Sequence, residues 1–419
     1  MHRIRAVLVA LAILGADAAA PLHAQQPLTL EQALQEARTA NAELPLAAFD
    51  ARIGQARLRE ARRALGPRLS VDADLHGGTP ARYAANDGRL QLLAEQPLYD
   101  GGALRAGIDV ARAAAAASQA GYRVAERDLD LEVRVDFATV LQLDTVIAVR
   151  RAGLARLRTY LDVIRARGAA GEGVAADLLK TQVQIGDADA ALADALRQRD
   201  LARLTLNDRL GRDPDAPLTL ATLPAPVAPA DTVPEGWAGA PDVLRAEAES
   251  AAAHSAIGLV TAERRPHLSL EMDAGAQPAF GTFGNGINNG QGWGTEFLLS
   301  FSWPLFDAGA YRARRAQARL QADQTRAATV AVRRQARLAW SAARAELVAR
   351  YREVEARGRT AGTALDSYLA SESLYRGGAT SALDVLDTYT SGITASEAVA
   401  AAVFEYRVAE AQLARWGSP

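Results

Sequence analysis

The alternation of apolar and polar residues predicts four β-strands in two pairs. From Arg68 to His76 the odd-numbered positions are apolar and the even-numbered positions are polar. This period of two predicts a strand. A second strand is predicted from Arg89 to Gln96, so residues 68–96 should form a β-hairpin. Residues 267–303 repeat the pattern, and their apolar face carries four aromatic residues: Trp293, Phe297, Phe301 and Trp303.

Very long helical patterns follow each predicted hairpin. Residues 103–168 contain no proline, and about 66 residues of helix would extend about 99 Å. A turn at 168–174 leads into a return helix that ends near residue 210. Residues 28–65 form a shorter helix that opens with a capping box at Thr29 and breaks near Pro45. We expect two short helices, stacked end to end, to match one long helix.

The same order of elements is written twice along the chain. A Pro-Leu-aromatic-Asp-x-Gly junction stands at 97–102 and again at 304–309, an offset of 207 residues. We expect the proline to end the strand ladder, the aspartate to cap the following helix and the glycine to permit the turn. The predicted repeats are residues 25–212 and 240–419. The proline-rich segment 213–239 between them is expected to be extended.

The second repeat contains matching helices around its hairpin. Helical patterns cover residues 240–265, 310–376 and 382–416, and a tip turn at 376–381 joins the last two. The expected fold class is therefore mainly α with a small β part. Its unit is a duplicated αββαα repeat with long antiparallel helices.

Composition excludes several classes of function. The 419 residues include no cysteine, which excludes disulfides and thiolate metal sites, and the net charge of −2 predicts no nucleic-acid surface. The five histidines lack metal-ligand spacing, and the sequence has no nucleophile elbow or phosphate loop. We therefore expect neither an enzyme nor a cofactor. Residues 1–24 resemble a signal peptide, which predicts export.

The aromatic strand face requires an apolar environment. A soluble sandwich would bury it against a second sheet, but four strands among so much helix offer no such sheet. A lipid-facing barrel fits better. Because small membrane barrels need about eight strands, several chains must contribute.

This layout resembles the TolC-like outer membrane efflux protein family. The most specific marks are the doubled junction and the segment 375–387, which is similar to the family pattern Tyr-x-x-Gly-x-x-Thr-x-x-Asp-Val-Leu-Asp. The resemblance implies a homotrimer with a shared 12-stranded barrel in outer-membrane lipid and a periplasmic helical tunnel. It also implies a periplasmic adaptor that docks on the helical tips, and an inner-membrane pump of the RND or ABC type.

The resemblance also assigns roles to individual residues. Asp384 and Asp387 match the acidic residues that ring the periplasmic mouth of the tunnel. The alternative is that Asp384 merely lies near a helix start and that Asp387 is a solvated surface residue, with no role at a pore. The candidate gate residues are Asp177, Tyr375, Arg376 and Thr380. The candidate adaptor-docking tip turns contain Gly171, Gly378 and Ser381.

The expected function is a passive exit duct that conveys substrate delivered by an energised pump. Drug, solvent or metal-ion efflux and type I protein secretion all stay open. The alternative is a periplasmic coiled-coil scaffold or adaptor without a membrane barrel. That alternative leaves the aromatic strands unexplained.

Overall fold

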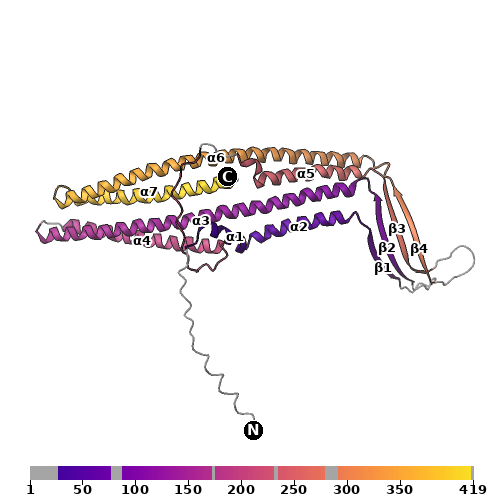
Figure 1. The fold of residues 1–419 in the computed structure, drawn as a ribbon, viewed down its shortest axis with the longest axis horizontal. Helices are drawn as coiled ribbons and strands as arrows, with labels where there is room; N and C mark the ends of the chain where they lie inside the picture. The colour runs from indigo at the N-terminus through magenta and orange to yellow at the C-terminus, as the bar shows by residue number, and fades with distance from the viewer. Residues whose placement is uncertain (1–26, 77–86, 172–174, 231–234, 279–290, 417–419) are drawn as a thin grey trace, which may run out of the picture.

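The computed structural model describes residues 27–76, 87–171, 175–230, 235–278 and 291–416. Long helices lie side by side in an elongated bundle, and a small sheet projects from one end (Figure 1). The first half contains α1 (Leu30–Ala40), α2 (Leu44–Arg63), β1 (Arg68–His76), β2 (Asp87–Tyr99), α3 (Ala103–Ala169) and α4 (Ala175–Arg209). The second half contains η1 (Trp237–Gly239), α5 (Pro241–Ala262), β3 (His267–Pro278), β4 (Gln291–Ser302), α6 (Ala310–Arg376) and α7 (Ala382–Ala414).

The helices form a wall four helices wide, and two of the four helices are replaced by others halfway along its length. Close to the sheet, neighbouring helices pack in the order α2, α3, α5, α6, whereas towards the far tips the order is α4, α3, α7, α6. The predicted end-to-end stacking of short helices against a long one is confirmed (Figure 1). Of the described helices, none is both long and apolar enough to cross a membrane.

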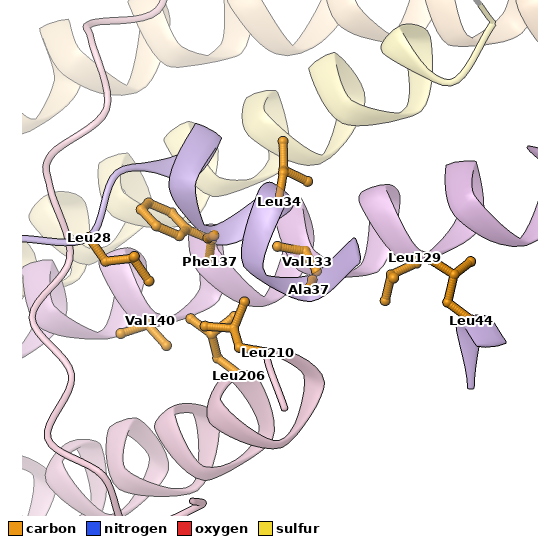
Figure 2. Packing of buried hydrophobic residues seen from close by; sticks show 11 residues of the cluster. Leu28, Leu34, Ala37, Leu44, Leu129, Val133, Phe137, Val140, Leu206 and Leu210 are labelled. Carbon is orange, nitrogen blue, oxygen red and sulfur yellow. The ribbon is translucent and has the colours of Figure 1, made fainter. Parts of the chain in front are cut away.

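In the first half of the chain, a buried apolar cluster lies at the change-over, the level at which one short helix replaces another beside α3. Val133 and Phe137 of α3 are fully buried among residues of α1 and the end of α4, including Leu206 and Leu210 (Figure 2). In the second half, Trp340 of α6 lies 207 residues after Val133 and packs with Val243 at the start of α5. The duplicated sequence therefore builds a duplicated core.

The predicted start and break of the first helix are confirmed. Thr29 and Gln32 form both hydrogen bonds of the capping box. The side chain of Asn41 then accepts hydrogen bonds from the backbone N–H groups of Glu43 and Leu44, so it caps the new helix that begins beside Pro45.

The four strands form one antiparallel sheet in the order β1-β2-β3-β4. The register places Leu69, Ala94, Met272 and Phe297 in one row across all four strands. The adjacent rows on this face are apolar except for Gln96 and Thr295, and the exposed fractions of Leu69 and Phe297 are 69% and 66%. The predicted apolar faces thus join into one continuous, uncovered surface within the described residues.

The junctions differ from the sequence prediction in two ways. Pro97 does not end the ladder, because β2 continues to Tyr99. Beyond Glu95, β2 has lost its partner β1 and pairs only with β3, so the missing N–H of Pro97 faces the free side. Each helix N-cap is a glycine, Gly102 or Gly309, rather than the aspartate. Asp100 and Asp307 lie two residues earlier and accept hydrogen bonds from N–H groups of the first helical turn.

Some boundaries also shift. The second strand begins at Asp87 rather than Arg89, and β4 ends at Ser302, so Trp303 lies just beyond the sheet. Helix α3 continues through Gly168, and the first tip turn therefore starts at Ala170. Residues 172–174 of that predicted turn lie outside the described residues.

The segment between the two halves crosses the wall as a strap. Leu28 and Leu220 form a parallel β-bridge, and the Tyr406 hydroxyl of α7 donates to the carbonyl of Val227 at 3.0 Å. Arg407 donates to the carbonyl of Pro224. The predicted extended linker is thus bonded to α7.

Candidate functional site at the helical tips

The turn between α6 and α7 has a defined backbone geometry. Gly378 has φ +75° and donates its N–H to the carbonyl of Tyr375 at 3.0 Å, while Ala379 donates to Leu374 at 2.9 Å. These two bonds make a Schellman motif, which requires the left-handed conformation that glycine adopts without strain. Gly171 has φ +85° at the end of α3. Both glycines therefore supply tip-turn conformations, whereas adaptor docking stays a prediction.

Helix α7 begins with a capping box that includes one of the predicted mouth residues. Ser381 is the N-cap, and its hydroxyl and backbone N–H both donate to the Asp384 carboxylate, at 2.7 and 3.1 Å. The Thr380 hydroxyl donates to the same oxygen at 2.8 Å. These donors, the Ser381 hydroxyl first, hold the pKa of Asp384 below its ordinary value. Asp384 is therefore ionised at neutral pH and helps to start the helix.

Asp387 lies one turn further along α7. It is exposed, and its carboxylate makes no hydrogen bond or ion pair with the described part of the chain. Because residues three apart share a helix face, Asp384 and Asp387 both project near the tip on one side of α7. Their carboxylates thus differ in role, since only Asp384 serves the local fold.

A second cluster joins the two helical hairpins. The Tyr375 hydroxyl of α6 donates to the Asp177 carboxylate of α4 at 3.0 Å, and Tyr375 is only 2% exposed. Arg167 of α3 donates to the Tyr375 carbonyl at 2.8 Å and stacks 4.5 Å from the centre of its ring. Burial and the bond to Asp177 raise the pKa of Tyr375. One tyrosine therefore connects three helices.

Two members of this cluster were not predicted from the sequence. Tyr160 of α3 packs edge-to-face on Tyr375 with ring centroids 5.2 Å apart, and Arg167 stacks on the same Tyr375 ring. Tyr160 is buried, which raises the pKa of its hydroxyl, and that hydroxyl has no hydrogen-bond partner among the described residues. The only sign of them in the sequence was their spacing of seven residues, about two helical turns, which places Tyr160 and Arg167 on the same face of α3.

The predicted gate residues are only partly brought together. Asp177 and Tyr375 are in contact, but Arg376 pairs with Glu372 of its own helix at 2.5 Å. Thr380 bonds to Asp384 rather than to the cluster around Tyr375.

A further contact between the hairpins lies between 16 and 20 residues from the tip caps Ser381 and Ala170. Arg150 of α3 pairs with Glu397 of α7 at 2.6 Å and also donates to the Ala191 carbonyl of α4. Close by, Gly153 of α3 is buried against α7, where a Cβ atom would stand 2.5 Å from Ile393 Cδ1 and 2.9 Å from the Tyr389 hydroxyl. The helices α3 and α7 are therefore in very close contact at Gly153.

At the opposite end, the predicted lipid-facing aromatics lie on or beside the apolar sheet face. Phe297 and Phe301 are 66% and 65% exposed. Trp303 is 54% exposed, and its indole N–H donates to the Arg264 carbonyl at 3.2 Å. Trp293 belongs to the same register row as Ala276, but its side chain lies outside the described residues.

Solved structures share this fold over almost the whole chain. The channel CusC has a TM-score of 0.82 and 18% identity, covering 93% of this chain and 92% of its own. The outer membrane protein VceC from Vibrio cholerae has a TM-score of 0.79 and 19% identity, covering 93% and 96%. The Neisseria gonorrhoeae MtrE outer membrane channel, in its open state, has a TM-score of 0.78 and 21% identity, covering 92% and 88%.

The comparison with sequence families assigns the chain to a family. No curated protein matches the chain. The model of the family described as "Outer membrane efflux protein" matches residues 33–212 and 235–416, which together make up most of the sequence. With its four-stranded sheet and long helical extension, the chain belongs to the outer membrane efflux protein family.

Proposed function

We propose that three copies of this chain form a passive exit duct, with a shared 12-stranded barrel and a periplasmic helical tunnel. The observation that carries the proposal is the continuous apolar sheet face, which no described element covers. The strands β1 and β4 each have one side without a partner among the described strands. Open edges of this kind pair readily with another chain, and lipid is the solvent that suits the apolar face.

The helical wall supports the same ring. Large exposed apolar residues occur on its edge helices α2, α4 and α6, such as Phe49, Val183 and Leu338. Of the described central helices, α3 and α5 carry none and α7 carries only Leu383, at its start. A surface that joins two different edges is heterologous, and such contacts form a ring when the rotation from copy to copy closes. We propose the edge α6 of one copy against α2 and α4 of the next.

The tips would then form the mouth and the gate. Three copies of Asp384 and Asp387 would concentrate negative charge around a narrow opening, which favours cations and offers a site for block by multivalent cations. The bond between Tyr375 and Asp177 would hold the two hairpins together in the closed state. Gly171, Gly378 and Ser381 would shape the turns on which a periplasmic adaptor docks.

The duct would act as one part of a tripartite system. An inner-membrane pump of the RND or ABC type would supply the energy, and the duct would hydrolyse nothing. We divide the chain into two repeats, residues 25–212 and 240–419, joined by the strap at 213–239.

The test is the mass of the mature protein in detergent, followed by single-channel recording in planar bilayers. A trimer with a small, cation-selective conductance is expected. A water-soluble monomer or dimer without channel activity would refute the duct and favour a periplasmic coiled-coil scaffold.

A further inference from the structure

The end of the helical wall next to the sheet is strongly basic. Residues 52–68 and 303–319 together hold ten arginines and two acidic residues, although the whole chain has a net charge of −2. These segments are the end of α2 and the start of α6, the two outer helices of the wall at this level. The positive charge is therefore concentrated on the edges and beside the sheet.

Most of these arginines are not needed by the fold of a single chain. Arg314 pairs with Glu263 at 2.9 Å. In contrast, Arg57, Arg63, Arg312 and Arg319 are exposed and form no ion pair within the described ranges. Arg312 also lies in the first turn of α6, where a positive charge opposes the helix dipole. Helix stability therefore does not explain this arginine.

The geometry places Arg63 and Arg312, at the helix ends beside the sheet, at the level of lipid headgroups. Arg57 and Arg319 lie about 9–11 Å further from the sheet along the same helices. The nine residues of β1 extend about 30 Å, and a tilt of about 40° reduces that to about 23 Å, close to the apolar band of a membrane barrel. The exposed aromatic residues Trp303 and Phe306 come directly after β4, at the same end of the sheet as the start of β1, as in the girdle at a membrane interface. Arg312 comes six residues after Phe306.

Closure of the ring would bring the two basic edges together. In the order α2, α3, α5, α6, the start of α6 in one copy adjoins the end of α2 in the next. Arg312 lies five full turns from the exposed Val330, and Arg57 follows Phe49 and Ile53 at four-residue spacing, so these arginines share the exposed apolar edge faces. Like charges in contact repel unless an anion lies between them.

We propose that each boundary between subunits binds the headgroup of an anionic phospholipid of the inner leaflet, between the end of α2 and the start of α6. The phosphate would pair with arginines of both copies, and the acyl chains would lie on the apolar sheet face. This inference rests on the proposed ring. The lipid would then act as a bridge between subunits.

Native mass spectrometry of the full-length protein in a non-ionic detergent tests the proposal, with phosphatidylglycerol and phosphatidylcholine of identical acyl chains as probes. We expect tighter binding of phosphatidylglycerol to the trimer. Each arginine near an anionic headgroup contributes about a five-fold factor. The variants R57Q/R63Q and R312Q/R319Q each remove one arginine at this level, so each should lose this preference by about five-fold or more.

The control is R334Q/R337Q, which removes the same charge from exposed, unpaired positions further along α6. It should retain the preference. Equal binding of both lipids, an equal loss in the control, or full displacement of phosphatidylglycerol by inorganic phosphate would overturn the inference. A trimer that binds both lipids equally refutes only the lipid site, whereas a monomer in every spectrum refutes the ring itself.

Discussion

The close contact at Gly153 gives a prediction in which two effects oppose each other. Replacing a glycine inside a helix by alanine stabilises the helix by about 1 kcal/mol. At Gly153 the new methyl group would overlap Ile393 of α7 and approach the Tyr389 hydroxyl. Overpacking of this kind costs about 1–3 kcal/mol. We therefore expect Gly153→Ala to be destabilising by up to about 2 kcal/mol.

Gly121 is the matched control for this substitution. It lies in the same helix α3, and a Cβ atom there would meet nothing within 4 Å. Gly121→Ala should therefore show only the gain in helix propensity, about 1 kcal/mol. The difference between the two variants isolates the contact between α3 and α7.

The assay is thermal denaturation of the purified protein, followed by far-ultraviolet circular dichroism. Gly153→Ala should melt below the parent protein and Gly121→Ala above it. Shortening the opposing side chain by Ile393→Val should restore part of the loss, which a double-mutant cycle would measure. If Gly153→Ala melts at or above Gly121→Ala, the contact is not tight and the reasoning is refuted.

Three further predictions concern the tips and the sheet. Tyr375→Phe removes the hydrogen bond to Asp177, worth about 1.5–3 kcal/mol for a charged acceptor, so single-channel conductance should rise; an unchanged conductance would exclude a latch role. Phe297→Arg should cost about 2–4 kcal/mol near mid-bilayer and reduce assembly into membranes, and normal assembly would contradict the lipid-facing orientation. Asp387→Ala should weaken block by divalent cations without affecting the start of α7, whereas Asp384→Ala should also weaken its capping box. Because the pKa of Asp384 is lowered in the fold, its capping contribution is present at neutral pH and lost as the pH falls through that lowered pKa. If divalent cations block both variants and the parent protein equally, the two aspartates do not line the pore mouth.

Long, regular elements could be predicted from the sequence because their signals are local. The predicted bounds of α6 match the observed Ala310–Arg376, since a long proline-free pattern between two glycine-containing turns suffices to define a helix. The strand faces followed from simple alternation, and the register confirms them.

Features that depend on contacts between distant segments were not predicted. Pro97 continues in a strand because β1 has already ended beside it, which the local sequence does not reveal. Tyr160 and Arg167 contact Tyr375 only because α3 packs beside α7 and the end of α6 reaches α3 at the tips. The sequence gives no sign that Gly153 is special, because its contact is with the distant helix α7.

The change-over halfway along the wall has a mechanical consequence. At that level α2 and α5 give way to α4 and α7, while only α3 and α6, of the described helices, continue past it. A displacement at the tips can therefore reach the sheet only along these two rods, or through the strap that is bonded to α7. Each chain therefore has two stiff segments of four helices, joined by only two continuous helices. Bending should concentrate at the level of Val133 and Trp340, where the fewest helices continue.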